Sequence, residues 1–145
     1  MPSNDRGTTR ILRAAVAAIR PRGHGFDQRI DEDVLAEMQQ FFLHLPAPMR
    51  LAFPMGLRLL EYGPPVFARR LTRFSSMPAD EARAYLEDFL HAGGPRTALV
   101  MGLRALVLLA FYQHPQVLND MGVDWAGRAK LLTARRAELL AGKAS

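Results

Sequence analysis

Histidines and acidic residues are the side chains of this sequence most able to bind a metal ion or move a proton. The four histidines are His24, His44, His91 and His114. No two of them stand three or four positions apart, the spacing at which one helix directs two imidazoles at one metal ion. The chain also has no cysteine, which excludes thiolate metal sites, disulfides and cysteine nucleophiles. We therefore predict no metal site and no cofactor held by this chain.

The hydroxyl and carboxylate side chains form no catalytic pattern either. Ser75 and Ser76 lack the flanking glycines of a nucleophile elbow. Because Pro78 follows closely, we expect one of these serines to cap a helix that starts there. The acidic residues within 80–88 lie opposite the apolar stripe of that helix and are expected to face water. We predict no catalytic residue, and an enzyme would need a pocket that these motifs do not reveal.

The charge of the chain points to an anionic partner. The formal net charge is +5 and the sequence pI is about 10.4. Basic residues gather at the two ends of the sequence, within 6–29 and 128–143, whereas acidic residues gather within 27–37 and 80–88. Such ends could attract an acidic protein, an anionic membrane or nucleic acid. Aromatic residues do not alternate with the arginines, as base stacking requires, so nucleic acid is the alternative and not the leading prediction.

The spacing of apolar residues predicts helices throughout and no strand. Two helices are expected over residues 8–19 and 31–45. A proline-rich region follows, with a helix over 49–62 that is kinked or restarted near Pro54, and a short helix over 65–73. Further helices are expected over 78–92 and 95–113, then one turn within 116–122 and a last helix over 125–140. The helix over 95–113 is apolar around most of its circumference, which predicts that it lies in the core with Leu106 buried.

These elements predict an all-α fold. We expect a compact bundle of about six to seven helices with a central apolar helix and a C-terminal helical arm. The predicted organisation is a flexible N-terminus over 1–7, a helical domain over 8–123 and the arm over 124–145. Residues 46–74 carry more apolar side chains than short helices can hide, so part of this region is expected to contact a partner.

The sequence also indicates where the protein works. Its longest apolar run, residues 105–112, falls far short of the roughly 20 residues that a membrane span needs. No apolar stretch of signal-peptide type follows the start. We therefore expect no transmembrane segment and a cytoplasmic location.

Three stretches together resemble the gluconate 2-dehydrogenase subunit 3 family. They are ILRAAVAAIRP at 11–21, RFSSMPADEAR at 73–83 ahead of Tyr85-Leu86, and MGLRAL at 101–106 leading to YQHP at 112–115 and MGVD at 121–124. The resemblance covers about residues 11–125. Many members of that family begin with a twin-arginine export signal, which this sequence lacks, so the resemblance implies an intracellular complex here.

The resemblance implies a function without catalysis. Family members are small gamma subunits that bind and stabilise, or chaperone, a larger FAD-dependent dehydrogenase or oxidase of the glucose–methanol–choline (GMC) type. The FAD is expected in that flavoprotein partner and not in this chain. Positions that match the family's recurring residues are implied to be structural or interface residues: Arg73, Phe74, Arg83, His114, Pro115 and Gly122. To these we add Phe67 and Trp125 as candidate contacts with the partner.

Overall fold

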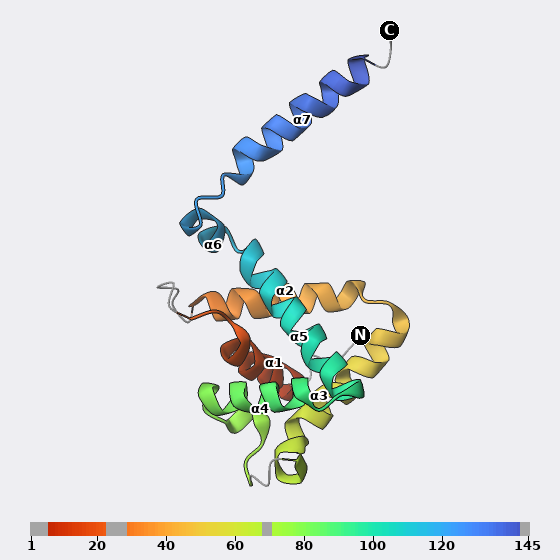
Figure 1. Ribbon diagram of the computed structural model, residues 1–145, viewed down its shortest axis with the longest axis vertical. Helices are drawn as coiled ribbons and strands as arrows, with labels where there is room; N and C mark the ends of the chain where they lie inside the picture. The colour runs from red at the N-terminus through yellow and green to blue at the C-terminus, as the bar shows by residue number, and fades with distance from the viewer. Residues whose placement is uncertain (1–5, 23–28, 68–70, 143–145) are drawn as a thin grey trace. The chain divides into compact units, whose positions relative to one another are not determined.

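The computed structural model describes residues 6–22, 29–67 and 71–142, and over these ranges it contains helices and no strand (Figure 1). The predicted all-α fold is therefore confirmed. The α-helices are α1 (Arg6–Ile19), α2 (Arg29–His44), α3 (Ala47–Phe67), α4 (Ala79–His91), α5 (Gly94–Gln113), α6 (Pro115–Asp120) and α7 (Trp125–Gly142), with a 3-10 turn η1 (Phe74–Ser76) before α4. The chain divides into two units, Met1–Phe111 and Tyr112–Ser145.

The helix boundaries follow the predicted ones closely except in the proline-rich region. The predicted short helix over 65–73 is wrong: α3 continues through Pro54, Pro64 and Pro65 as one helix and ends at Phe67. Proline removes one backbone donor and crowds the preceding turn, which normally interrupts a helix. Leu57 and Leu60, both fully buried, lie between these prolines, and their packing favours helix through the whole stretch. Most of the predicted N-terminal segment over 1–7 lies outside the described residues.

The first unit is organised around α1, which lies between α2 and α4 and also packs on α3 and η1 (Figure 1). Its apolar stripe is buried along its length and consists of Ile11, Leu12, Ala15, Val16 and Ala18. Beside this helix, three aromatic rings pack in a row at tilted angles. The ring centroids of Phe74 and Tyr85 are 6.0 Å apart, and those of Tyr85 and Phe89 are 4.7 Å apart. Burial of these apolar side chains is the main stabilising contribution to the unit.

Arginine side chains stabilise the C-terminal end of α1 and its contact with the start of α2. Arg83 donates from Nε to the carbonyl oxygen of Ala18 at 2.8 Å and from Nη2 to that of Arg20 at 3.0 Å. These carbonyls end α1 and have no partner within the helix, so Arg83 satisfies them and also places a positive charge at the negative end of the helix dipole. Arg20 in turn pairs with Asp31 of α2 at 2.8 Å.

α5 is the apolar helix that the sequence predicts, but the expectation that most of its circumference is buried is wrong. It buries one face, formed by Val100, Leu103, Val107, Ala110 and Phe111. Leu106, predicted to lie in the core, is only half-buried, and Met101 and Leu109 are exposed. By length and composition alone α5 could cross a membrane, a test that core helices of soluble proteins also pass. A helix apolar all round therefore has here one covered and one uncovered side.

In the second unit, local hydrogen bonds define the joint between α6 and α7. Gly122 has a φ of 67° and its N–H donates to Asn119, while the N–H of Val123 donates to Leu118. This pair of bonds is a Schellman ending, for which glycine is favoured at the left-handed position. The next helix is then capped by Asp124, whose Oδ1 accepts from the N–H of Gly127 at 2.8 Å.

Candidate functional site

The face of α3 that points away from the core carries a row of exposed apolar side chains. Its side chains recur every three or four residues, so they share one side of the helix. They are Leu51, Met55, Leu59, Tyr62 and Val66, between 42% and 75% exposed. We call this set the α3 stripe. On the opposite side of the same helix Leu57 and Leu60 are buried, so α3 is apolar on two sides and covered on one.

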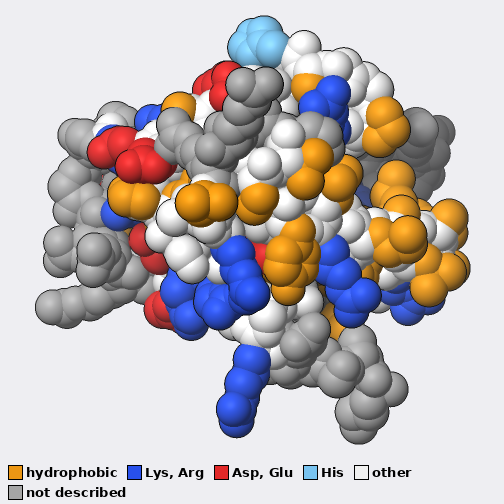
Figure 2. Space-filling view, turned by 90° about the horizontal axis from the view of Figure 1, so that it is seen from below, with side chains coloured by type: hydrophobic (Ala, Val, Ile, Leu, Met, Phe, Trp, Pro, Cys, Tyr) orange, Lys and Arg blue, Asp and Glu red, His pale blue; other side chains and the backbone are white. Residues whose placement is uncertain are grey.

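The α3 stripe confirms the excess of apolar residues predicted for residues 46–74. Leu71, just beyond α3, is also fully exposed. Scattered exposed apolar residues are common on soluble proteins, but a continuous row along a helix is typical of an interaction surface. Figure 2 shows one face of the molecule on which hydrophobic side chains gather beside arginine and lysine side chains.

Glu61 anchors the covered side of α3 and was missed by the sequence analysis. It is only 2% exposed, yet its carboxylate accepts hydrogen bonds from three donors. Arg10 of α1 donates at 3.2 Å, the Ser75 hydroxyl at 2.7 Å and the Ser75 N–H at 2.9 Å. Such saturation offsets the cost of burying a charge. One side chain thereby fixes α3 against both α1 and η1.

This arrangement corrects the predicted role of the serines. Neither Ser75 nor Ser76 caps α4, because the N-cap position is Pro78 and no side chain caps that helix. Ser75 instead holds Glu61. A signal for the burial of Glu61, though not for its partners, was present in the sequence, because Glu61 shares the spacing of Leu57, Leu60 and Pro64 and therefore lies on the buried side of the helix.

Three of the predicted residues lie in the stretch from η1 into α4, and their environments differ: Arg73 precedes η1, Phe74 begins it and Arg83 lies within α4. Arg73 is exposed, and its guanidinium lies over the Tyr62 ring at 5.4 Å from the centroid. Phe74 is wholly buried in the core, so of the two roles implied for it the structural one fits and direct contact with a partner does not. Arg83 is half-buried and bound to the end of α1, where it has a structural role.

Three further predicted residues, His114, Pro115 and Gly122, gather around α6. His114 is the N-cap of α6 and its Nδ1 accepts from the N–H of Gln116 at 3.3 Å, Pro115 opens the helix, and Gly122 ends it. The two remaining predicted residues are Phe67, which ends α3, and Trp125, which begins α7; their side chains lie outside the described part of the structure. The predicted residues are thus distributed over both units.

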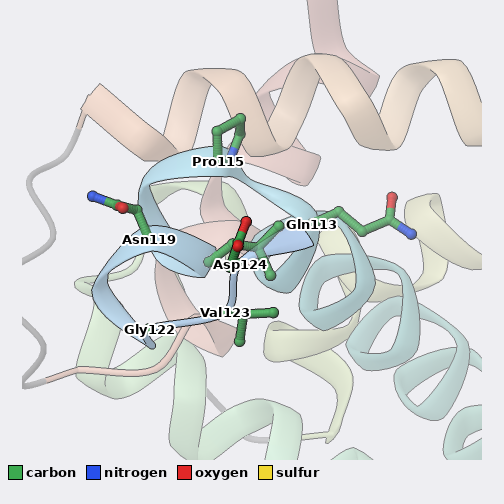
Figure 3. Close-up of a pocket in the computed structure, with 7 residues that line it drawn as sticks. Gln113, Pro115, Asn119, Gly122, Val123 and Asp124 are labelled. Carbon is green, nitrogen blue, oxygen red and sulfur yellow. The ribbon is translucent and has the colours of Figure 1, made fainter. Parts of the chain in front are cut away.

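An open hollow of about 820 Å³ lies at the joint between α6 and α7 (Figure 3). Pro115, Leu118 and Val123 supply much of its apolar lining, with Gln113, Asn119, Gly122 and Asp124 completing it. The amides of Gln113 and Asn119 point away from each other in Figure 3, and Asp124 already caps α7. A small-molecule site needs polar groups that converge on the ligand. The polar groups of this hollow do not converge, so we interpret it as the space left by the turn between α6 and α7.

The histidines of the described residues serve their own helices. The Nδ1 of His44 lies 3.0 Å from the Gln40 carbonyl oxygen, and that of His91 lies 2.8 Å from the Glu87 carbonyl oxygen. Among the residues described, no group of three or more metal-binding side chains comes together. His24 lies outside the described ranges.

Comparison with known proteins gives no relative from which a function could be transferred. No family model, no curated protein and no solved structure matches the chain. The function must therefore be argued from the surface that the structure presents.

Proposed function

We propose that this chain is a non-catalytic small subunit that binds and stabilises a larger FAD-dependent GMC-type alcohol or sugar dehydrogenase or oxidase. The observation that carries the proposal is the α3 stripe, a row of five apolar side chains that the first unit leaves exposed. The resemblance of residues 11–125 to small subunits of flavin-dependent dehydrogenases supports a flavoprotein as the partner. The FAD and the chemistry belong to that partner.

Covering the α3 stripe with a partner would remove apolar surface from water and so lower the free energy of the complex. Removing apolar surface from water stabilises a complex by roughly 25 cal/mol per Å², before the costs of association. Permanent interfaces are larger and more apolar than transient ones, and they resemble a domain core cut in two. A second apolar side on a helix that already fills the core fits that description.

The test is co-expression of this chain with a flavoprotein encoded beside it. We expect the two to purify together, with flavin absorbance in the complex and none in this chain alone. Leu59→Asp should remove the small subunit from the complex and lower the soluble, flavin-loaded fraction of the large one. Glu37→Gln, an exposed change on α2, serves as the matched control. A large subunit that is soluble, flavin-loaded and fully active without this chain contradicts the proposal.

The exposed charges of α7 favour nucleic acid binding as the alternative. Arg128, Lys130, Arg135 and Arg136 are all exposed there, against a single acidic residue, Glu138. Binding of this kind depends on neutralising phosphates and therefore weakens steeply with salt. Salt-sensitive retention of the purified chain on DNA, lost when Arg135 and Arg136 are changed to glutamate, would support this alternative.

A further inference from the structure

The exposed apolar surface of the first unit continues from α3 onto α5. The outer side of α5 carries Ala98, Met101, Ala105 and Leu109, spaced by three or four residues; all are exposed, Met101 by 59% and Leu109 by 46%. We call this set the α5 stripe. The two helices meet at Gly56, where an added Cβ would lie 2.7 Å from Leu99 Cδ1. This close approach joins the surfaces of the two helices.

Each stripe lies on the side of its own helix that faces away from the core. The buried residues of α3, Leu57 and Leu60, and those of α5, Leu103 and Val107, occupy the side of each helix that faces the core of the first unit. The exposed stripes occupy the opposite side of each helix, and the contact of Gly56 with Leu99 brings the two helices together. Gly102 of α5 adds open space, because a Cβ built there would meet no atom within 4 Å. Together the two stripes form one apolar face, which we call the α3–α5 face.

The charged side chains that α3 and α5 themselves expose are all basic. Arg50 and Arg58 are exposed on α3, and Arg104 is exposed on α5. The one acidic residue of α3, Glu61, is buried, and α5 contains none. Arg73 adds a fourth positive charge over Tyr62 of the α3 stripe. Arg104 has an acidic side chain of α4 near it, Glu87, at 3.9 Å.

We propose that the α3–α5 face binds an acidic amphipathic helix of the partner protein, an inference that rests on the proposed function. An apolar row on such a helix would cover the two stripes, as in other complexes where a helix packs on a groove between helices. Acidic residues beside that row would meet the arginines. A second copy of this chain is a poor occupant, because its face would bring arginine against arginine.

The proposal separates the roles of the two kinds of residue. The apolar stripes provide affinity, and changes to them should raise the dissociation rate. The arginines select the acidic partner and speed association, so their effect should fade as salt rises. An anionic bilayer could also attract an apolar face rimmed with arginine, and it is the competing outcome to exclude.

The probes for the test are two synthetic amphipathic peptides with the same leucine face. One carries glutamates on its polar side and the other lysines, and vesicles of phosphatidylglycerol are the third probe. With the full chain, we expect the glutamate peptide to bind at least about tenfold more tightly than the lysine peptide, with a difference that shrinks in salt. Met55→Asp should abolish binding, whereas Leu131→Asp, an equally exposed leucine of α7, should leave it unchanged.

Charge reversal sharpens the test. Arg58→Glu should weaken binding of the glutamate peptide and strengthen binding of the lysine peptide. Circular dichroism should show that the protein stays folded. Equal binding of both peptides, no binding of the glutamate peptide, or binding insensitive to Met55→Asp would each overturn the proposal. Vesicle binding that depends on Met55 while neither peptide binds would show a membrane surface instead.

The two proposals fail in different ways. If the flavoprotein co-purifies with the chain and Met55→Asp has no effect on the complex, the accessory function stands and the α3–α5 face is not its docking surface. If the glutamate peptide binds as expected but the flavoprotein is soluble and flavin-loaded alone, the face binds an acidic helix of a different partner and the accessory function falls.

Discussion

α1 and α3 are both amphipathic by sequence, yet they use their apolar residues differently. α1 has one apolar stripe, and neighbouring elements cover it from Ile11 to Ala18. α3 has apolar residues on two sides, and the first unit covers only the side that contains Leu57 and Leu60. Periodicity therefore reveals which sides of a helix are apolar, but it does not reveal how many sides the rest of the chain can cover.

Neighbouring leucines of α3 offer the most severe test of this difference. Leu60 is 0% exposed and Leu59 is 42% exposed. Leu60→Asp should unfold the first unit, because an unpaired buried carboxylate costs several kcal/mol against a total stability of about 5–15 kcal/mol. Leu59→Asp should keep the thermal unfolding midpoint near that of the unaltered protein. Far-UV circular dichroism during heating measures both, and similar midpoints for the two variants would show that α3 has no uncovered side.

Glu61 tests whether the covered side of α3 depends on its polar anchor. Glu61→Ala removes the acceptor for Arg10 and Ser75, and we expect a loss of about 1–3 kcal/mol in the free energy of unfolding. Combining it with Ser75→Ala should give a smaller loss than the sum of the two single changes, because both remove the same hydrogen bond. Urea titrations of the four proteins provide the cycle, and additive losses would mean that the two side chains act independently.

The hydroxyl of Tyr85, on α4, is a buried polar group in the core that α4 forms with α1. It is buried and makes no hydrogen bond within the described residues, and its burial raises the pKa of Tyr85 above the ordinary value. Tyr85→Phe should leave stability at neutral pH unchanged or raise it by up to about 1 kcal/mol. The unfolded chain releases this proton at lower pH than the folded one, so stability should fall as pH rises above about 10. Urea titrations across that range should show a shallower fall for Tyr85→Phe; equal slopes would place the hydroxyl in water.

The smallest expected effects come from two adjacent acids of α2: Asp31, which pairs with Arg20 just after α1, and Glu32, which pairs with Arg13 of α1. Burial raises the pKa of Asp31, although Arg20 opposes this, whereas the hydrogen bond from Arg13 lowers the pKa of Glu32. Stability contributed through Asp31 should therefore decrease as pH rises from its ordinary pKa to the raised one. Stability contributed through Glu32 is present above its ordinary pKa and should be lost as pH falls through the lowered one.

Single variants separate these two opposite slopes. Asp31→Asn should remove the decrease in the free energy of unfolding that Asp31 causes as pH rises. Glu32→Gln should remove the decrease that Glu32 causes as pH falls. Urea titrations at mildly to strongly acidic pH measure both. The change from Glu32 should be slight, because its ion pair with Arg13 is exposed to solvent. Slopes of the same sign for the two variants would contradict the environments described for these carboxylates.

The sequence was sufficient for the helices and insufficient for their surroundings. Proline, glycine and apolar spacing placed the helices over 79–91 and 94–113 within a few residues, because these signals act locally. The contact of Glu61 with Ser75, and with Arg10 far earlier in the chain, depends on how distant elements pack, which no local pattern reports. The same limit explains why the sequence left open whether Phe74 is a structural or an interface residue, whereas the structure places it in the core.

The joint between α6 and α7 has a consequence for the order in which the chain folds. Its hydrogen bonds join residues at most five positions apart, from Val123 back to Leu118, whereas Arg10 and Glu61 of the first unit are 51 positions apart. Short loops close in roughly 10–100 ns, and longer closures cost more entropy. Gly127 leaves room for the Asp124 carboxylate that caps α7, because a side chain at position 127 would collide with it. The turn into α7 is thus encoded within a few residues and forms on a timescale that is independent of the slower assembly of the first unit.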